Sequence, residues 1–234
     1  MHSTKTKLLD TLGLEVRRSG TLSHFLKTRP IDLVVDAGAN LGEFATSLRQ
    51  KGYRGRIHSF EPVAFVFEAM KIACDRDPLW DASRVALGAS SGQASMNVFD
   101  NHTLSSFLDA TSLLSQYDTG GSSRTEDVRV VTLDDMLIDD PAKHIFLKAD
   151  VQGFEKQVLE GASATLSRTV ALYLELPVDH LYEGSWSFRE AINYIDDLGF
   201  EPAQFRMVNG RPNDAASAVE FDCLFRRKTV ARDT

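Results

Sequence analysis

The feature that most constrains this chain is an apolar run that ends in an acid and a small-residue turn. The stretch from Val34 to Gly42 reads VVDAGANLG. A buried strand with this ending leads the chain onto the start of a helix, where free backbone N–H groups can hold a polar or anionic ligand group. Glycine permits the tight turn and a close backbone approach, and asparagine tolerates a left-handed backbone. The stretch therefore predicts the first strand, turn and helix of a ligand-binding sheet.

Strand and helix patterns alternate along the chain from residue 31 onward. Strands are predicted at Ile31–Asp36, Arg56–Phe60, Arg84–Leu87, Ser95–Phe99, Val128–Thr132, Ile145–Asp150 and Val170–Leu176, with a closing hairpin of Phe200–Val208 and Phe221–Phe225. Helices are predicted at Leu41–Leu48, after Pro62, at Phe154–Leu166 and at Phe188–Leu198. This alternation predicts an α/β fold, a mostly parallel sheet with helices on both faces.

Two segments fall outside the alternation. Loose apolar stripes at residues 5–28 predict one or two short helices, so residues 1–30 are expected to form an N-terminal helical extension that caps the domain or pairs with a second subunit. Because the extension could pair with a second subunit, a homodimer is one of the alternatives. Residues 100–127 are rich in Ser, Thr, Asp and Gly with little periodicity, which predicts a long loop that is functional or disordered.

The bulk composition narrows the class of protein. The 234 residues suit one α/β domain, and 43% hydrophobic with 25% charged residues is typical of a globular protein. A net charge of −7 disfavours nucleic acid as a partner, because broad phosphate binding needs clustered cations. The chain shows neither the apolar core of a signal peptide nor the roughly 20 apolar residues that cross a bilayer, so a cytoplasmic location is expected. Cys74 and Cys223 are expected to be reduced and buried.

Acidic residues stand at the carboxyl ends of several predicted strands. They are Asp36, Glu61, Asp150 and Glu175. In a parallel sheet, ligands bind beyond these ends. Glu61 has the position of a ribose ligand, because a carboxylate can accept hydrogen bonds from both vicinal hydroxyls.

The first turn differs from the dinucleotide fingerprint G-x-G-x-x-G. Asn40 replaces the second glycine, and Gly42 follows at a shorter spacing. Asp36 would repel a pyrophosphate but would attract an ammonium group. A ligand with a ribose and a positive charge fits both observations, and S-adenosylmethionine has both, so it is favoured over a dinucleotide.

A further cluster at Lys148–Glu155 completes a set of motifs that resembles a known family. The set comprises Asp36–Gly42, Phe60–Pro62, Ala86–Gly88, Lys148–Glu155 and Leu174–Leu176. Together these motifs resemble the FkbM family of S-adenosylmethionine-dependent methyltransferases over about residues 31–176. The resemblance implies a Rossmann-like class I methyltransferase fold with seven strands and a methyltransferase domain at residues 31–234. It also implies O-methylation of a sugar, glycoconjugate or natural product.

The resemblance also implies contacts with the cofactor. By motif position, the methionine part would be held by Asp36, Gly38, Asn40 and Gly42, and the ribose by Glu61. Two further contacts are expected from their places in the chain. Ser106 stands at the start of the long loop, where a serine can bind the adenine end or the acceptor, and Asp150 ends a central strand.

Methyl transfer to an alcohol needs alignment and the removal of a proton. The candidates for this task are Asp150, Glu175 and His180. A divalent ion such as Mg²⁺ between Asp150 and Glu175 would lower the pKa of a sugar hydroxyl, and metal dependence stays open. Glu155 is expected to stabilise the first turn of its helix instead.

Two other functions stay open. An oxidoreductase that uses NAD or a nucleotide sugar would also need Glu61, although Asn40 at the second glycine position counts against it. A non-catalytic, methyltransferase-like partner protein would share the fold. The acids at the strand ends count against that alternative.

Overall fold

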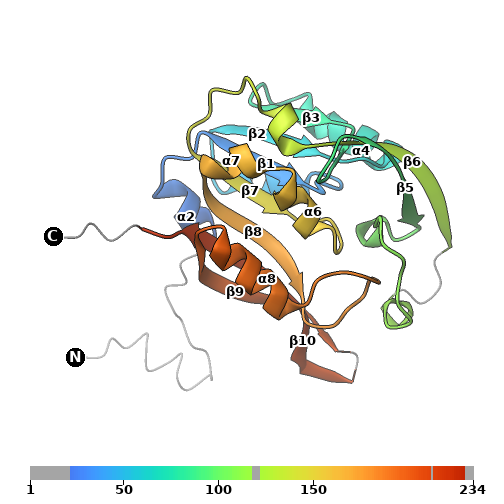
Figure 1. Ribbon diagram of the computed structural model, residues 1–234. Coiled ribbons are helices and arrows are strands. Elements are labelled where there is room, and N and C mark those ends of the chain that lie inside the picture. The colour runs from blue at the N-terminus through green and yellow to red at the C-terminus, as the bar shows by residue number, and fades with distance from the viewer. Residues whose placement is uncertain (1–21, 118–121, 212, 230–234) are drawn as a thin grey trace, which may run out of the picture.

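A seven-stranded sheet runs through the middle of the molecule (Figure 1). The computed structural model describes residues 22–117, 122–211 and 213–229. In sheet order the strands are β3 (Trp80–Ser83), β2 (Arg56–Phe60), β1 (Leu33–Ala37), β7 (Ile145–Ala149), β8 (Thr169–Pro177), β10 (Asp214–Arg227) and β9 (Phe200–Arg211). The first five strands are mutually parallel, and β10 is antiparallel to both of its neighbours. The predicted α/β sheet is thus mostly parallel, with antiparallel pairing at the end formed by β10 and the edge strand β9.

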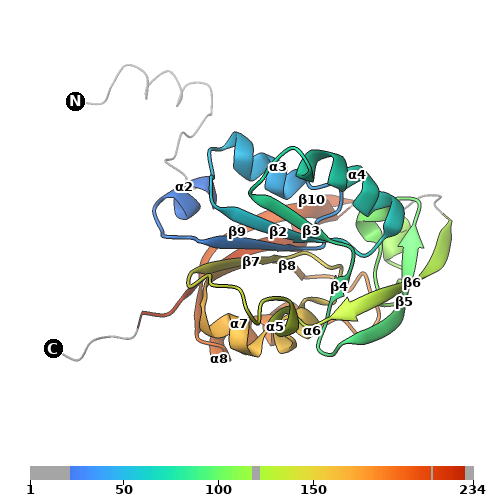
Figure 2. The same ribbon diagram turned by 90° about the horizontal axis from the view of Figure 1, so that it is seen from above.

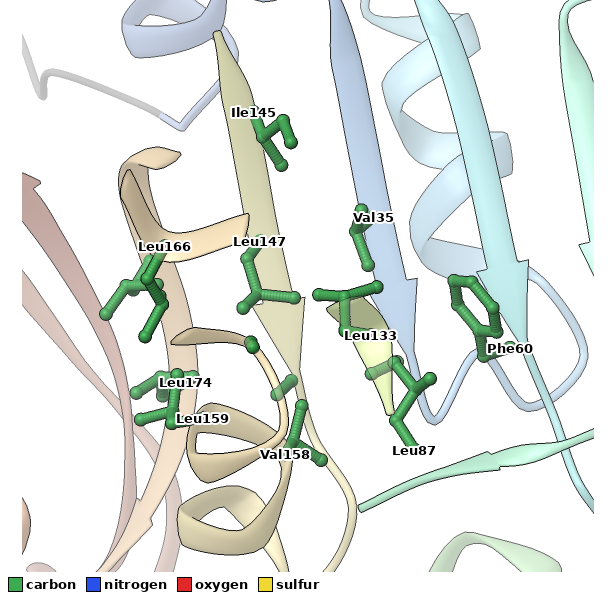
Figure 3. Close-up of a cluster of buried hydrophobic side chains, with 14 of the residues drawn as sticks. Val35, Phe60, Leu87, Leu133, Ile145, Leu147, Val158, Leu159, Leu166 and Leu174 are labelled. Atoms are coloured by element: carbon green, nitrogen blue, oxygen red, sulfur yellow. The ribbon is translucent and has the colours of Figure 1, made fainter. Parts of the chain in front are cut away.

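Helices cover both faces of this sheet (Figure 2). One face carries α2 (Leu22–Lys27), α3 (Glu43–Gln50) and α4 (Ala64–Cys74), and the other carries α5 (Leu133–Met136), α6 (Glu155–Glu160), α7 (Ser163–Ser167) and α8 (Phe188–Asp197). All residues of β1 and β7 are buried, as expected for strands covered on both faces. Their side chains alternate between two apolar clusters: Val34 packs in one, and Val35 and Leu147 pack in the other, shown in Figure 3.

A smaller sheet lies beyond the carboxyl ends of the central strands (Figure 2). Its strands are β4 (Ala86–Leu87), β6 (Ser123–Val131) and β5 (Gly92–Phe99), in that order. Two short 3-10 helices follow β5, η1 at His102–Leu104 and η2 at Leu114–Gln116. Residues 100–127 are therefore less irregular than predicted, because β6 already begins at Ser123.

The predicted third strand at Arg84–Leu87 is wrong for the main sheet. That position belongs to β3, Trp80–Ser83, while Ala86–Leu87 forms β4 of the smaller sheet. Only Trp80 of β3 is buried, so this edge strand has no apolar run to reveal it.

The single helix predicted over Phe154–Leu166 is divided into α6 and α7 at Gly161. A side-chain carbon at Gly161 would lie 2.0 Å from the backbone oxygen of Gly88, so the two backbones approach each other at the division. The close approach explains why a glycine stands here.

Residues 1–21 of the predicted N-terminal extension lie outside the described residues. Within the described part, α2 packs Phe25 and Leu26 into the same cluster as Val34. No described helix is long and apolar enough to span a membrane. The prediction that Cys74 and Cys223 are free and buried is confirmed.

Candidate functional site

A cavity of about 500 Å³ lies at the carboxyl ends of the parallel strands. The turn after β1 and the residues after β2 form one side, and η1 and the smaller sheet form another. The opposite wall comes from β8 and from the β9–β10 hairpin. A concave site of this size suits a small molecule or a cofactor.

Some of the site residues predicted from the sequence line this cavity. Its lining includes Gly38, Asn40, Glu61, Asp150 and Glu175. The other predicted site residues, which are Asp36, Gly42, Ser106 and His180, are not part of the lining. The sheet edge thus brings together residues that are far apart in the sequence, and it leaves four of the predicted residues behind or beside the cavity.

The glycine turn is held tightly against the neighbouring strand ends. Gly38 has φ +68°, and a side-chain carbon there would lie 1.9 Å from the backbone oxygen of Asp150. Asn40 also has a positive φ, 50°. Gly42, with φ +78°, precedes α3 and packs against Trp80, so it supports the turn from beneath. These positions need glycine or asparagine because the backbone is left-handed.

Glu61 connects the two turns at the cavity edge. Its Oε2 accepts a hydrogen bond from the backbone N–H of Asn40, and its Oε1 accepts one from Val63, both at 2.9 Å. Glu61 is buried, and burial raises its pKa to about 7 despite these two hydrogen bonds. Each carboxylate oxygen keeps a second lone pair for a ligand hydroxyl.

Asp36 is fully buried behind the cavity. Its Oδ1 lies 3.2 Å from the Nζ atom of Lys148, and its Oδ2 accepts a hydrogen bond from Ser59 at 3.3 Å. Lys148 in turn donates to the carbonyl oxygens of Ala37 and Gly38, at 3.2 and 2.8 Å. Burial alone would lower the pKa of Lys148, but the charges of Asp36 and Asp150 raise it above its usual value. The pair therefore fixes the glycine turn from below.

Asp150 and Glu175 are joined by the side chain of Gln152. The Gln152 Nε2 atom donates to Asp150 Oδ1 at 3.0 Å and to Glu175 Oε2 at 2.9 Å. Asp150 Oδ2 lies 3.7 Å from the Nζ atom of Lys148. Burial, followed by the charges of Asp150 and Glu220, raises the pKa of Glu175 well above its usual value.

The hairpin adds residues to the cavity that sequence reasoning missed. Glu220, Asp222, Arg206 and Asn209 all line it. Arg206 forms an ion pair with Asp222, and Asn209 donates to Glu220 at 3.3 Å. Burial raises the pKa of Glu220 to about 7. The spacing of Glu220 and Asp222, two residues apart on one strand, was the available signal, because such residues share a face of a sheet.

Ser106 and His180 have supporting positions. Ser106 is fully buried; its hydroxyl donates to the backbone oxygen of Gln152 at 2.7 Å and accepts from the N–H of Leu108 at 3.1 Å. His180 Nδ1 lies 3.1 Å from the Ser185 hydroxyl, outside the cavity lining. In the described part of the chain, no three His, Cys, Asp or Glu side chains are grouped to hold a metal ion.

Comparison with known proteins connects this geometry to a family. Residues 36–202 match the family described as "Methyltransferase FkbM domain". The fold resembles the crystal structure of a methyltransferase FkbM from Methylobacillus flagellatus, with a TM-score of 0.55 and 20% identity over 89% of this chain and 46% of that one. The present chain therefore spans less than half of that protein.

Two other solved structures are less similar. One is magnesium protoporphyrin IX methyltransferase from Synechocystis with bound SAM, with a TM-score of 0.47 and 12% identity over 96% of this chain and 80% of that one. The other is an rRNA methylase from Streptococcus thermophilus, with a TM-score of 0.49 and 12% identity over 92% and 99% of the two chains. No curated protein matches the chain.

Proposed function

The chain belongs to the methyltransferase FkbM domain family, and from this membership we propose that it is an S-adenosylmethionine-dependent O-methyltransferase. Its acceptor would be a hydroxyl of a sugar, glycoconjugate or natural product. One observation carries the proposal: a single cavity has the glycine turn and Glu61 on one side and the carboxylates of Asp150 and Glu175 on the other. The first side suits an adenosyl cofactor, and the second suits an acceptor that must lose a proton.

The residues beside the turn fit the polar parts of S-adenosylmethionine. The backbone at Gly38 and Asn40 would hold the amino-acid end, and Glu61 would accept hydrogen bonds from the ribose hydroxyls. Asp150 lies against Gly38 and supplies negative charge for the cofactor's ammonium group. When bound, the cofactor supplies a methyl group on a positively charged sulfur.

The chain's own task in the reaction is to place the acceptor and to accept its proton. Negative charge near the sulfonium favours cofactor binding but does not by itself favour the transition state, in which the positive charge disperses. Rate must come from alignment of the acceptor oxygen and from proton removal. We assign the base to Glu175, because it lines the cavity and because burial raises its pKa, which makes it a stronger base than an ordinary carboxylate.

The charge of the cavity supports a neutral, hydroxyl-rich acceptor. Glu175 and Glu220 can accept hydrogen bonds from sugar hydroxyls on the wall formed by β8 and β10. The two cations in the lining, Lys148 and Arg206, are already paired with Asp36 and Asp222. A phosphorylated acceptor would meet more negative than positive charge there.

Isothermal titration with S-adenosylmethionine and with S-adenosylhomocysteine tests the first half of the proposal, with NADH as the comparison ligand. We expect both adenosyl compounds to bind and NADH not to bind. Absence of binding by both compounds at high micromolar concentration would refute the proposal. Incubation with an isotope-labelled methyl donor and a sugar-rich cell extract, followed by mass spectrometry, then identifies the acceptor.

A further inference from the structure

Every hydrogen-bonding group of the Gln152 side chain is engaged. Its amide nitrogen has two hydrogens, and these point to two different carboxylates, Asp150 and Glu175. Its amide oxygen accepts a hydrogen bond from the Tyr182 hydroxyl at 2.9 Å. The two carboxylates accept hydrogen bonds, so they fix the amide with its nitrogen toward them. The amide oxygen then faces the Tyr182 hydroxyl, whose single hydrogen is shared with the Leu104 carbonyl oxygen at 2.8 Å.

The backbone at Gln152 is also fixed by hydrogen bonds. Its φ is 54°, a left-handed value that is uncommon for a residue with a side chain. The Ser106 hydroxyl donates to its carbonyl oxygen at 2.7 Å. Glu155 Oε1 accepts hydrogen bonds from the backbone N–H groups on either side, Val151 at 2.9 Å and Gly153 at 3.3 Å. Such strain persists only where the surroundings over-determine it, which is typical of functional sites.

We propose that Gln152 is a positioning residue, which clamps the Asp150 and Glu175 carboxylates at a fixed separation and keeps Glu175 available as a proton acceptor. The proposal rests on the proposed function, in which Glu175 takes the acceptor's proton. The amide donates a hydrogen bond to each carboxylate, and at Glu175 such a bond favours the ionised state. It touches one oxygen of each group, Oδ1 of Asp150 and Oε2 of Glu175.

The clamp works against a strongly acidic surrounding. The charged and titratable groups around Glu175 on the neighbouring elements are Lys148 and Asp150 of β7 and its following loop, Glu155 of α6, Tyr182, Arg206 of β9, and Glu220, Asp222 and Cys223 of β10. Burial and its acidic neighbours raise the pKa of Glu175. The neutral amide of Gln152 opposes this rise in pKa without adding a charge. A lysine or a glutamate at position 152 would add one.

The test measures the pKa of Glu175 directly, without cofactor or acceptor. The protein is labelled with ¹³C at its glutamate carboxyl carbons, the Glu175 signal is assigned with Glu175→Gln, and the signal is followed across pH by NMR. Gln152→Met removes the donor and keeps a similar side-chain length. Gln93→Met on β5 is the control, because Gln93 is exposed and lies outside the cavity lining.

In Gln152→Met we expect the pKa of Glu175 to rise by about one unit or more, since a hydrogen bond to the ionised form is lost. Gln93→Met should leave it unchanged. An unchanged or lower pKa in a folded Gln152→Met variant would overturn the proposal.

Tyr182→Phe is the second variant, and it decides the matter if Gln152→Met does not fold. It removes the hydroxyl that contacts both the amide oxygen and the Leu104 carbonyl oxygen, so the amide is held less firmly and the pKa of Glu175 should rise by a smaller amount. No rise in this variant would likewise contradict the clamp. Titration of the unaltered protein with S-adenosylhomocysteine tests the proposed function separately, so failure of the function and failure of the clamp give different results.

Discussion

At the scale of single residues, burial separates the acids at the sheet edge into two groups. Asp36 is fully buried and paired with Lys148, so its charge is used inside the protein. Glu61, Asp150 and Glu175 line the cavity, so their remaining hydrogen-bonding capacity is open to it. The same residue type at equivalent strand ends therefore performs different tasks.

The ion pair of Asp36 and Lys148 gives the first prediction. Lys148→Met should destabilise the protein by about 3–5 kcal/mol, because it leaves a buried carboxylate without its partner. The double variant Lys148→Met with Asp36→Asn should recover part of this loss. Urea unfolding followed by circular dichroism measures both. A single variant as stable as the unaltered protein would show that the pair does not support the turn.

The second prediction concerns Glu61. Glu61→Ala should weaken binding of S-adenosylhomocysteine by about 1–3 kcal/mol, because charged hydrogen bonds to the ribose are lost. The matched control is Glu68→Ala, since Glu68 is an exposed residue of α4. Isothermal titration of both variants measures the difference. Equal affinity of the two variants would remove Glu61 from the binding site.

The sequence predicted which strand ends carry acids, but not which way each side chain points. Asp36 points to Lys148, and the role of Lys148 could not be assigned from the sequence because it depends on which strands become neighbours. Gln152 has no apolar or charge pattern, and its clamp depends on a contact with Glu175 from another strand. Glu220 and Asp222 were missed because the hairpin was considered only as a closing element.

At the scale of elements, the site is made by turns that touch one another. The turn after β1 lies against the loop after β7, because Gly38 approaches the backbone of Asp150. Strongly patterned elements such as β1, β7 and α8 were predictable from the sequence. The short edge strand β3 was not, because only Trp80 in it is buried. The early start of β6 was also missed, since its first residues are exposed and polar.

Glycine variants test the contact between the turns. Gly38→Ala should abolish S-adenosylhomocysteine binding, because φ is +68° and the added carbon would overlap the Asp150 carbonyl at 1.9 Å. Gly92→Ala is the control, since nothing lies within 4 Å of its added carbon and its φ is not positive. Calorimetry and thermal unfolding of both variants give the result. Normal binding by Gly38→Ala would mean that the turns can separate without harm.

At the scale of the whole molecule, buried carboxylates cost stability when they ionise. Burial raises the pKa values of Glu61, Glu155 and Glu220 to about 7, and it also raises the pKa of Glu175 well above its usual value. The stability of the folded protein is therefore expected to depend on pH.

Stability should accordingly fall as the pH rises from the ordinary glutamate value of 4.5 to about 7. In this window the folded protein binds more protons than the unfolded chain, so raising the pH favours unfolding. Burial lowers the pKa of His58, so its effect on stability has the opposite sign. It is one group against four acids. The midpoint of urea unfolding at about pH 5.5 should exceed that at about pH 8. A higher midpoint at the alkaline pH would contradict this assignment.

The most direct test of the central claim is a crystal structure of the protein with S-adenosylhomocysteine. We predict density in the cavity, with the ribose hydroxyls against Glu61 and the amino-acid end between the Gly38 turn and Asp150. An empty cavity in crystals that contain the compound, or density bound elsewhere, would contradict the account.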